Sequence, residues 1–237
     1  MMLLPDLYQL CGPCYGSHQN VYALSFPAGK ELLLFDTGLD EPDRNIIEKN
    51  LSVWGLDTYD IRHVFLTHSH FDHAGNAAYF AERGAQIYIA GPDADAVENG
   101  SFGTISYSYG VSFPICPGIR RLSDGEVREA GGISISCYSV PGHTPGSMAY
   151  GFTWMGKKVL VTGDFLQTGA DIHTPVLGIR VDARYGYEDY RLSLKKMAQL
   201  PCDIVLPGHF RPCMENGSRL LGAGFREILV NRDLYKD

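Results

Sequence analysis

The chain has 237 residues, of which 45% are hydrophobic, and its formal net charge is −7. This size and composition are typical of a globular domain with a sizeable core, so we expect a single domain over residues 1–237. The negative charge opposes nonspecific binding to a polyanion, and a nucleic-acid partner is therefore not expected.

The first half of the chain alternates apolar runs with helical patterns. Its predicted strands cover residues 21–26, 31–35, 61–66 and 86–90. A helix is predicted over residues 42–54, where Pro42 suits the first turn, and a second over residues 74–83, with Gly84 as a stop. The segment 92–118 is rich in Ser, Gly and aromatic residues, and we expect it to form an irregular lid.

The second half repeats this alternation. Its predicted strands cover residues 133–140, 148–154, 158–162 and 204–206, and its predicted helices cover residues 187–199 and 217–232. Between them, residues 166–187 fit no regular element, so we expect a second recognition loop there. The pattern alone supports a layered fold of the α/β or α+β class.

The six cysteines are expected to be mostly reduced thiols rather than a disulfide framework. The start MMLLPDLY lacks the basic and then apolar stretch of a signal peptide, and no run reaches the roughly 18 apolar residues of a membrane span. We therefore expect a cytoplasmic protein without a membrane partner. Cys11 and Cys14 have the spacing of a redox dithiol in CGPC, but the motif precedes a loop and a strand instead of opening a helix, which favours coincidence.

The motif THSHFDHAG carries the densest group of metal-binding side chains. His68 and His70 are two residues apart, so on an extended chain they point the same way and can close on one ion. Asp72 and His73 follow the bend and can face a second ion. The motif therefore predicts two metal ions side by side.

Three further candidate ligands follow downstream, and each comes just after a predicted strand. They are His143 in VPGHTPGS, Asp164 in LVTGDFL and His209 in VLPGHF. Because sites in layered α/β domains form in the loops at strand ends, we expect these side chains to converge on one rim.

Together with Asp36 in LLLFDTGL, this ordered series resembles the metallo-β-lactamase-fold hydrolase superfamily, over about residues 21–209. The resemblance implies an αββα sandwich of two mixed sheets flanked by helices. It also implies that His68, His70 and His143 bind one metal, and that Asp72, His73 and His209 bind the other. Asp164 would bridge the two metals, and Asp36 would orient ligands through hydrogen bonds.

Two divalent ions are the expected cofactors, with zinc favoured and iron or manganese as alternatives. A water held between two ions has its pKa lowered from about 15.7 toward about 7, so hydroxide becomes available to attack a small-molecule substrate. Asp72 is the candidate to relay a proton to the leaving group.

The motifs PGHTPGS and GDFL are similar to those of glyoxalase II-like thioesterases and lactonases, which favours a thioester, lactone or related acyl substrate. Hydroxyacylglutathione is disfavoured, because only residues 210–237 follow His209, whereas glyoxalase II enzymes have a helical extension. The alternatives are a persulfide dioxygenase-like oxidoreductase with one iron at His68, His143 and Asp164, and a phosphodiesterase or ribonuclease of the same fold. A flavodiiron protein is disfavoured, because His70 stands where those proteins resemble a Glu.

Substrate contacts are expected from the two irregular segments. Tyr109 is the candidate from the first, and His173, Arg184 and Tyr187 are the candidates from the second, where the arginine could hold an anionic group. The sequence leaves a homo-oligomer open.

Overall fold

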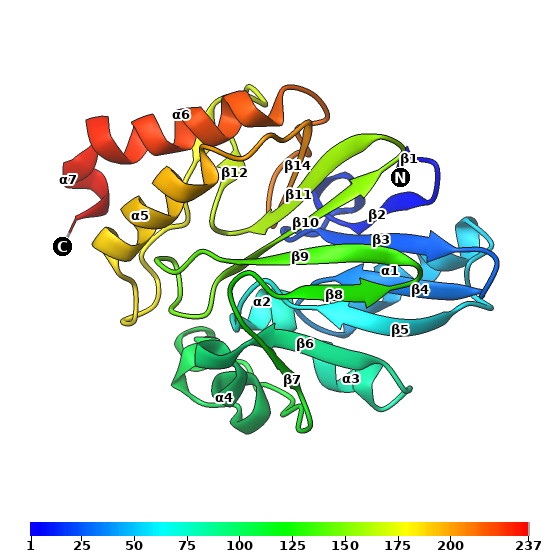
Figure 1. The fold of residues 1–237 in the computed structure, drawn as a ribbon. Helices are drawn as coiled ribbons and strands as arrows, with labels where there is room; N and C mark the ends of the chain where they lie inside the picture. Colours follow the sequence, from blue (N-terminus) through cyan, green and yellow to red (C-terminus); the bar gives the residue numbers. More distant parts are fainter. Residues whose placement is uncertain (237) are drawn as a thin grey trace.

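A computed structural model describes residues 1–236. Two β-sheets pack face to face, and helices cover the outer face of each, so the chain has four layers in the order helix, sheet, sheet, helix (Figure 1). This is the αββα sandwich that the resemblance implied.

The first sheet has seven strands in sequence order: β1 (Met2–Leu4), β2 (Leu7–Cys11), β3 (Val21–Phe26), β4 (Glu31–Phe35), β5 (Asp60–Phe65), β6 (Gln86–Ala90) and β7 (Arg120–Leu122). The strands from β1 to β4 pair antiparallel, whereas those from β4 to β7 pair parallel. Side chains alternate along β4, so that Leu32 and Leu34 face the outer helices while Leu33 and Phe35 face the second sheet.

The second sheet has five strands in the order β14 (Ile204–Pro207), β11 (Lys157–Gly163), β10 (Met148–Trp154), β9 (Ile133–Ser139) and β8 (Val127–Ala130). Only the β11 and β14 pair is parallel, so this sheet is also mixed. A small hairpin of β12 (Gln167–Thr168) and β13 (Pro175–Val176) lies in the segment before α5.

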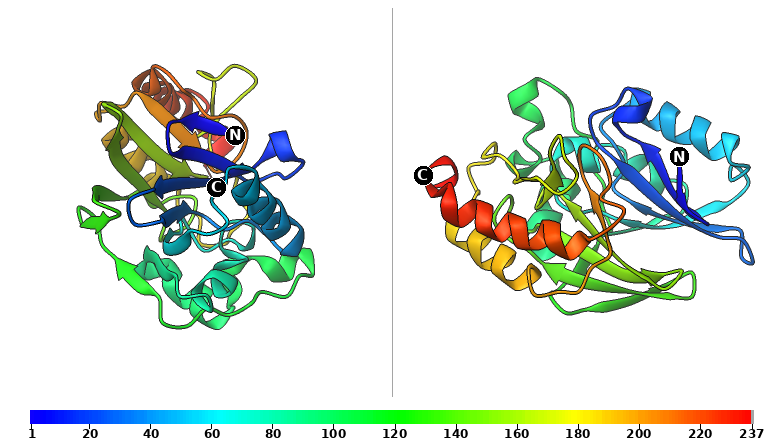
Figure 2. Two further views of the ribbon diagram at one scale, coloured as in Figure 1. Left: turned by 90° about the vertical axis from the view of Figure 1, so that its right-hand side faces the viewer. Right: turned by 90° about the horizontal axis from the view of Figure 1, so that it is seen from above.

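The helices cover the sandwich in two groups. On the first sheet lie α1 (Glu41–Val53), α2 (Phe71–Ala74), α3 (Ala77–Ala81) and α4 (Gly91–Asn99), and on the second lie α5 (Tyr187–Met197), α6 (Gly217–Val230) and α7 (Arg232–Tyr235). Figure 2 shows α5 and α6 side by side on the second sheet, on the opposite side of the molecule from α1. No helix of residues 1–236 is long and apolar enough to cross a membrane.

Several elements differ from the sequence predictions. Strands β1, β2, β7 and β8 were not predicted, because they are short or carry polar residues that hide the apolar pattern. The start of the expected lid is helix α4, with Pro92 in the first turn and Gly100 as a left-handed C-cap. The expected helix over residues 74–83 is broken into α2 and α3 around Gly75, where a Cβ atom would lie 1.9 Å from the Leu39 carbonyl oxygen.

The candidate site residues lie at one end of the sandwich. Asp36 follows β4, His68 follows β5, Asp164 follows β11 and His209 follows β14, while His143 lies in the turn between β9 and β10. Because the parallel pairs β4–β5 and β11–β14 end at the same edge of each sheet, residues distant in sequence meet there.

Candidate metal centre

Three histidines from two loops converge to form the first group of candidate ligands. His68, His70 and His143 offer ring nitrogens that lie within 4.8 Å of one another. The nearest pair, His70 Nδ1 and His143 Nε2, is 3.1 Å apart, and all three side chains are buried. We call these residues the first group.

Asp72, His73 and His209 form the second group, again with donor atoms within 4.8 Å of one another. His73 Nε2 and His209 Nε2 are 3.3 Å apart, and Asp72 Oδ2 lies 3.5 Å and 3.4 Å from these two nitrogens. This group is more open, because the side chains of Asp72 and His209 are 23% and 20% exposed whereas that of His73 is buried.

Asp164 lies between the two groups and faces both. Its Oδ1 is 3.3 Å from His73 Nε2 and 3.3 Å from His209 Nε2, whereas its Oδ2 is 3.6 Å from His143 Nε2. Gly208 permits this approach, because a Cβ atom there would lie 2.5 Å from Asp164 Oδ1.

The donor atoms fit metal ions. Two nitrogens bound to one tetrahedral zinc at about 2.0–2.1 Å stand roughly 3.3 Å apart, and the nearest nitrogen pairs of the two groups are 3.1 Å and 3.3 Å apart. His68 Nε2 is buried and has no hydrogen-bond partner within residues 1–236, which is the state of a ligand atom that faces an ion. Imidazole and carboxylate donors suit zinc, iron and manganese.

Asp36 supports the second group through hydrogen bonds. Its Oδ2 accepts a hydrogen bond from His73 Nδ1 at 2.9 Å and another from the Thr67 hydroxyl at 2.9 Å, and its Oδ1 accepts from the Thr67 backbone N–H at 2.7 Å. Asp36 has a φ of 60°, a left-handed conformation that is uncommon outside glycine and is found at functional sites. These contacts place Asp36 where it can fix the His73 tautomer, with Nε2 left to face the ion.

A buried ionic network holds the first group. His70 Nε2 lies 3.4 Å from Asp182 Oδ2, and Asp182 also accepts from the Arg184 Nε–H at 2.9 Å. Arg184 donates further to Asp93 at 3.2 Å and to the Ser69 hydroxyl at 3.1 Å. Asp93 and Asp182 are both buried, so the single guanidinium compensates two carboxylates that water does not reach.

Asp93 extends this network into the two loops that carry the first group. It accepts from the Ser69 backbone N–H at 2.9 Å, from the Thr144 hydroxyl at 2.7 Å and from the Gly146 backbone N–H at 3.1 Å. Ser69 lies between His68 and His70, and Thr144 follows His143. One carboxylate on helix α4 therefore fixes both ligand loops.

His209 is supported by a main-chain carbonyl oxygen and by the Asn20 side chain. Its Nδ1 donates to the His18 carbonyl oxygen at 2.9 Å, and Asn20 donates from Nδ2 to the carbonyl oxygens of Pro207 at 2.8 Å and Phe210 at 3.0 Å. The loop after Cys11 is thus a support for the second group. Cys11 itself is buried, which raises the pKa of its thiol to about 12, whereas Cys14 is exposed.

The two groups differ in their protonation. Burial and then the neighbouring imidazoles lower the pKa of His68 well below its usual value and that of His143 to about 3. Burial also disfavours charge in the second group, but Asp72, Asp164 and Asp36 outweigh it at His73 and raise its pKa well above the usual value. For His209, Asp164 and Asp72 outweigh burial and raise the pKa to about 10.

The four candidate substrate contacts fall in different places. Tyr109 is 61% exposed, and its ring centroid lies 4.8 Å from that of Phe71, the neighbour of Asp72. His173 is half-buried beside the Cys213 thiol at 3.8 Å and belongs to neither group of candidate ligands. Tyr187 is buried between α5 and α6, with its hydroxyl 3.4 Å from the Ile228 carbonyl oxygen, so it is a core residue in this structure.

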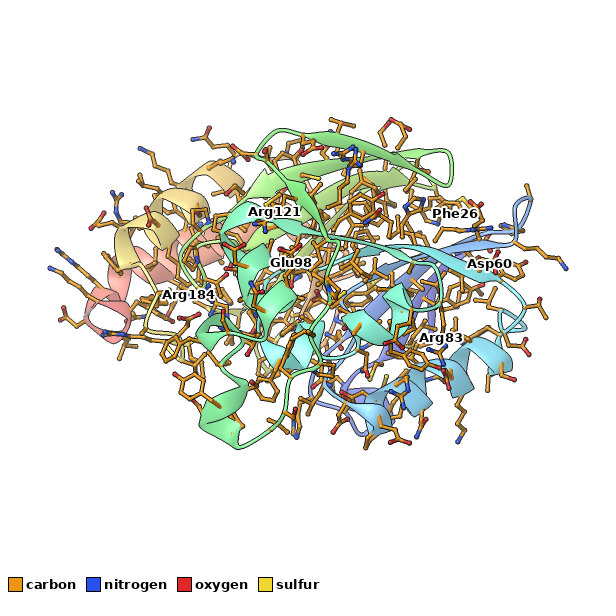
Figure 3. All side chains as sticks on the ribbon, turned by 90° about the horizontal axis from the view of Figure 1, so that it is seen from below. Phe26, Asp60, Arg83, Glu98, Arg121 and Arg184 are labelled. Carbon is orange, nitrogen blue, oxygen red and sulfur yellow. The ribbon has the colours of Figure 1, made fainter. Side chains whose placement is uncertain are left out.

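Arg184 requires a correction of its expected role. Figure 3 shows it where the loop before α5 meets the segment after α4. Its guanidinium is engaged by Asp182, Asp93, Ser69 and the Gly103 carbonyl oxygen at 2.9 Å, so its donors are committed to protein groups instead of a substrate anion. Sequence reasoning did not find Asp93, Asp182 or Thr67, because their partners are brought together only by the tertiary fold.

Comparison with known proteins agrees with this architecture. Residues 14–209 match the family described as the metallo-beta-lactamase superfamily. The chain is 29% identical over 153 residues to the "Probable polyketide biosynthesis zinc-dependent hydrolase BaeB" of Bacillus velezensis, covering 63% of this chain and 57% of that protein. It is 28% identical over 218 residues to the "Atrochrysone carboxyl ACP thioesterase" of Aspergillus fumigatus, covering 88% of this chain and 57% of that protein. The matched part thus spans little more than half the length of these curated relatives.

A solved structure supports the same fold. A metallo-beta-lactamase family protein from Thermus thermophilus superposes with a TM-score of 0.76 at 24% identity, covering 98% of this chain and 81% of that one. The family match covers most of the chain and includes the six residues of the two groups as well as Asp164. This chain therefore belongs to the metallo-β-lactamase superfamily.

Proposed function

We propose that this protein is a metal-dependent hydrolase that cleaves an acyl bond, with a thioester as the leading substrate class and a lactone or related ester as the next. One observation carries the proposal: two groups of nitrogen and oxygen donors, each at ligand spacing, share Asp164 between them. Zinc is the favoured metal, since the zinc-dependent hydrolase named above is among the relatives.

Each residue of the cluster has a proposed part. The first group would hold one ion and the second group the other, and Asp164, which faces both groups, would be a ligand shared by the two. Ions bound there supply Lewis acidity and a hydroxide nucleophile at neutral pH. Asp72 is the most exposed carboxylate of the cluster, so it is proposed to accept a proton and pass it to the leaving group.

The substrate class rests on the relatives and on the mouth of the site. One relative is named as a thioesterase that acts on an acyl carrier protein, and the other as a hydrolase of polyketide biosynthesis. The exposed ring of Tyr109, which contacts Phe71 at a tilted angle, and the 47% exposed ring of Phe210 beside His209 offer apolar surface to an acyl group. These features favour an acyl substrate over a phosphodiester.

A single set of measurements tests this function. Metal content of protein purified without added metal is determined first, and the same preparation is then assayed on a thioester, a lactone, a β-lactam and a phosphodiester. We expect near two equivalents of zinc and hydrolysis of the thioester or lactone. One equivalent of iron with oxygen consumption on a persulfide, or hydrolysis of the phosphodiester alone, would overturn the proposal.

A further inference from the structure

A cavity of about 410 Å³ has Phe210, the residue after His209, in its wall, and the ring centroids of these two residues are 6.4 Å apart. Its walls come from Met1 and β1, from Gln9 in β2, from the turn at Pro13–Tyr15 and from the loop that follows β14, segments that lie near one another in Figure 1. We call it the Phe210 cavity. Its volume is within the range of small-molecule sites, which is about 300–1,000 Å³.

Phe210 forms one wall in a strained conformation. Its φ is 63°, in the left-handed region that bulky side chains rarely adopt, and its side chain is 47% exposed. Asn20 maintains this conformation, because its Nδ2 donates to the carbonyl oxygens of Pro207 and Phe210. Strained backbone of this kind is found mainly at functional sites. The exposed ring of Phe210, next to the candidate metal ligand His209, therefore indicates a contact with a bound molecule.

Gln9, in another wall, offers a buried acceptor without a partner. Its Nε2 donates to Asn20 Oδ1 at 2.7 Å, and since Asn20 uses its own amide N–H groups on carbonyl oxygens, the orientation of both amides is fixed. Gln9 is 2% exposed, and its Oε1 has no hydrogen-bond partner within residues 1–236. At a carbonyl oxygen of this kind, an N–H of a bound molecule gains a hydrogen bond that the protein itself does not supply.

The remaining walls are mostly apolar and include two residues with a cationic group, Arg211 and Met1, whose amino group donates to the Gln9 carbonyl oxygen at 2.6 Å. Pro212 and Met214 supply apolar surface, and the exposed side chain of Arg211 has no ion pair within the described part of the chain. The Arg211 main chain is anchored, because its carbonyl oxygen accepts from the Thr168 hydroxyl at 2.7 Å. The cavity therefore combines surface for methylene groups, an acceptor for one N–H and positive charge.

We propose that the Phe210 cavity binds the thiol arm of a thioester substrate, and that this arm is a chain with an amide N–H and an anionic end. The inference rests on the proposed function, since the thioester carbon must lie at the metal centre. The amide N–H would donate to Gln9 Oε1, the methylene groups would pack on Phe210 and Met214, and the anionic end would pair with Arg211.

Cys14 provides a test that does not depend on hydrolysis. It lines the cavity and is exposed, whereas the other five cysteines are buried, so alkylation by N-ethylmaleimide should report on Cys14 alone. The probe is S-methyl pantetheine, a thioether that cannot be hydrolysed. We expect it to slow alkylation several-fold in the parent protein and much less in Phe210→Asn, in which Asn tolerates the left-handed backbone but removes the ring.

A pair of substrates tests the role of Gln9 without changing the protein. The first is an S-acyl N-acetylcysteamine, and the second replaces its amide N–H with an ester oxygen. The second should have a kcat/KM about five- to tenfold lower, as expected for the loss of one hydrogen bond to a buried acceptor. A phosphate-ended pantetheine thioester should be preferred over pantetheine thioester by the parent but not by Arg211→Gln.

The outcomes separate this inference from the proposed function. Protection of Cys14 without thioester hydrolysis would keep the cavity as a binding site and overturn the hydrolase. Thioester hydrolysis with no protection of Cys14 and equal rates on the amide and ester substrates would overturn the cavity. Arg191→Gln, which removes a surface arginine on α5 that pairs with Glu188, is the control for loss of one positive charge and should preserve the phosphate preference.

Discussion

The two groups of candidate ligands share Asp164 but differ in how the protein holds them. The first group is buried and rests on a network of three charged side chains, Asp93, Asp182 and Arg184. The second group is partly open to solvent, and its support is one carboxylate, Asp36, together with the His18 carbonyl oxygen. A buried group held by an ionic network thus lies beside a group that is partly open to solvent.

The two groups also differ in the pKa values of their histidines. The pKa of His143 is lowered to about 3 by burial and then by His70, so this imidazole is a neutral donor at any physiological pH. The pKa of His209 is raised to about 10, because Asp164 and Asp72 outweigh burial. The first group is therefore ready to receive a cation, whereas the second holds a proton that a cation must replace. The comparison predicts a tight first ion and a more exchangeable second ion.

The largest effect should follow from removing the carboxylate that both groups share. Asp164→Ala should abolish turnover, by more than about 10³-fold, and weaken both ions, since no other described carboxylate faces both groups. Metal content after dialysis and kcat measure the two effects. Retention of two tightly held ions in this variant would show that the groups are independent and that Asp164 does not bridge them.

The second group can be probed through its two carboxylates. Asp72→Asn keeps one ligand oxygen but removes the charge and the proton acceptor, so kcat should fall by about 10² or more. Asp36→Asn should be milder, because Asp36 acts through its hydrogen bonds to His73 and Thr67. Both variants are compared at full metal occupancy on one substrate. If Asp36→Asn were the more damaging, the division of labour between the two residues would be wrong.

The first group can be probed through its ionic network. Asp182→Asn removes the carboxylate that faces His70 Nε2 and Arg184, so the affinity of the first ion should fall by about 10- to 100-fold. Competition with a chelator measures that affinity, and thermal unfolding of the metal-free protein reports on the fold separately. Asp171→Asn is the matched control, because Asp171 is an exposed carboxylate in the same segment that accepts from the His173 backbone N–H. If the two variants bound the first ion with equal affinity, the Asp182 network would not be what holds the first group more rigidly than the second.

The contrast between the groups also shows what could be predicted from the sequence. The alternating histidines from His68 to His73 predicted two neighbouring donor sets, because that signal is local. The sandwich was predicted by the resemblance, and the long strands by their apolar runs. Helix α4 could have been recognised from Pro92, which suits the first turn, and Gly100, which suits the C-cap.

The supports of the first group could not be predicted in this way. Asp182 is 112 residues from His70, and Arg184 is 91 residues from Asp93. Neither pair has a local signal, because each partner lies in a different loop and the contact exists only after the two sheets have packed. Arg184 was therefore assigned to a substrate anion, since an arginine after Asp164 has no visible partner in the sequence.

The smallest expected effect is the pH dependence of metal binding, which reports the proton that the second group releases. Because the pKa of His209 is about 10 in the metal-free protein, its imidazole is charged at pH 7 and must lose a proton to bind a cation. Affinity for the second ion should therefore rise about tenfold for each pH unit between pH 6 and pH 9 per proton released. The first group should show little change over this range, since the pKa values of His68 and His143 lie below it.

Calorimetric titration of zinc into metal-free protein, in buffers of different ionisation enthalpy, counts the protons released with each ion. We expect more protons with the second ion than with the first. His209→Gln isolates the first group, because it removes one ligand of the second group and leaves His68, His70 and His143 in place. In that variant the pH dependence of zinc binding should become shallow. An equally steep dependence there would mean that the first group also exchanges a proton for its cation, and that the two groups do not differ in charge state.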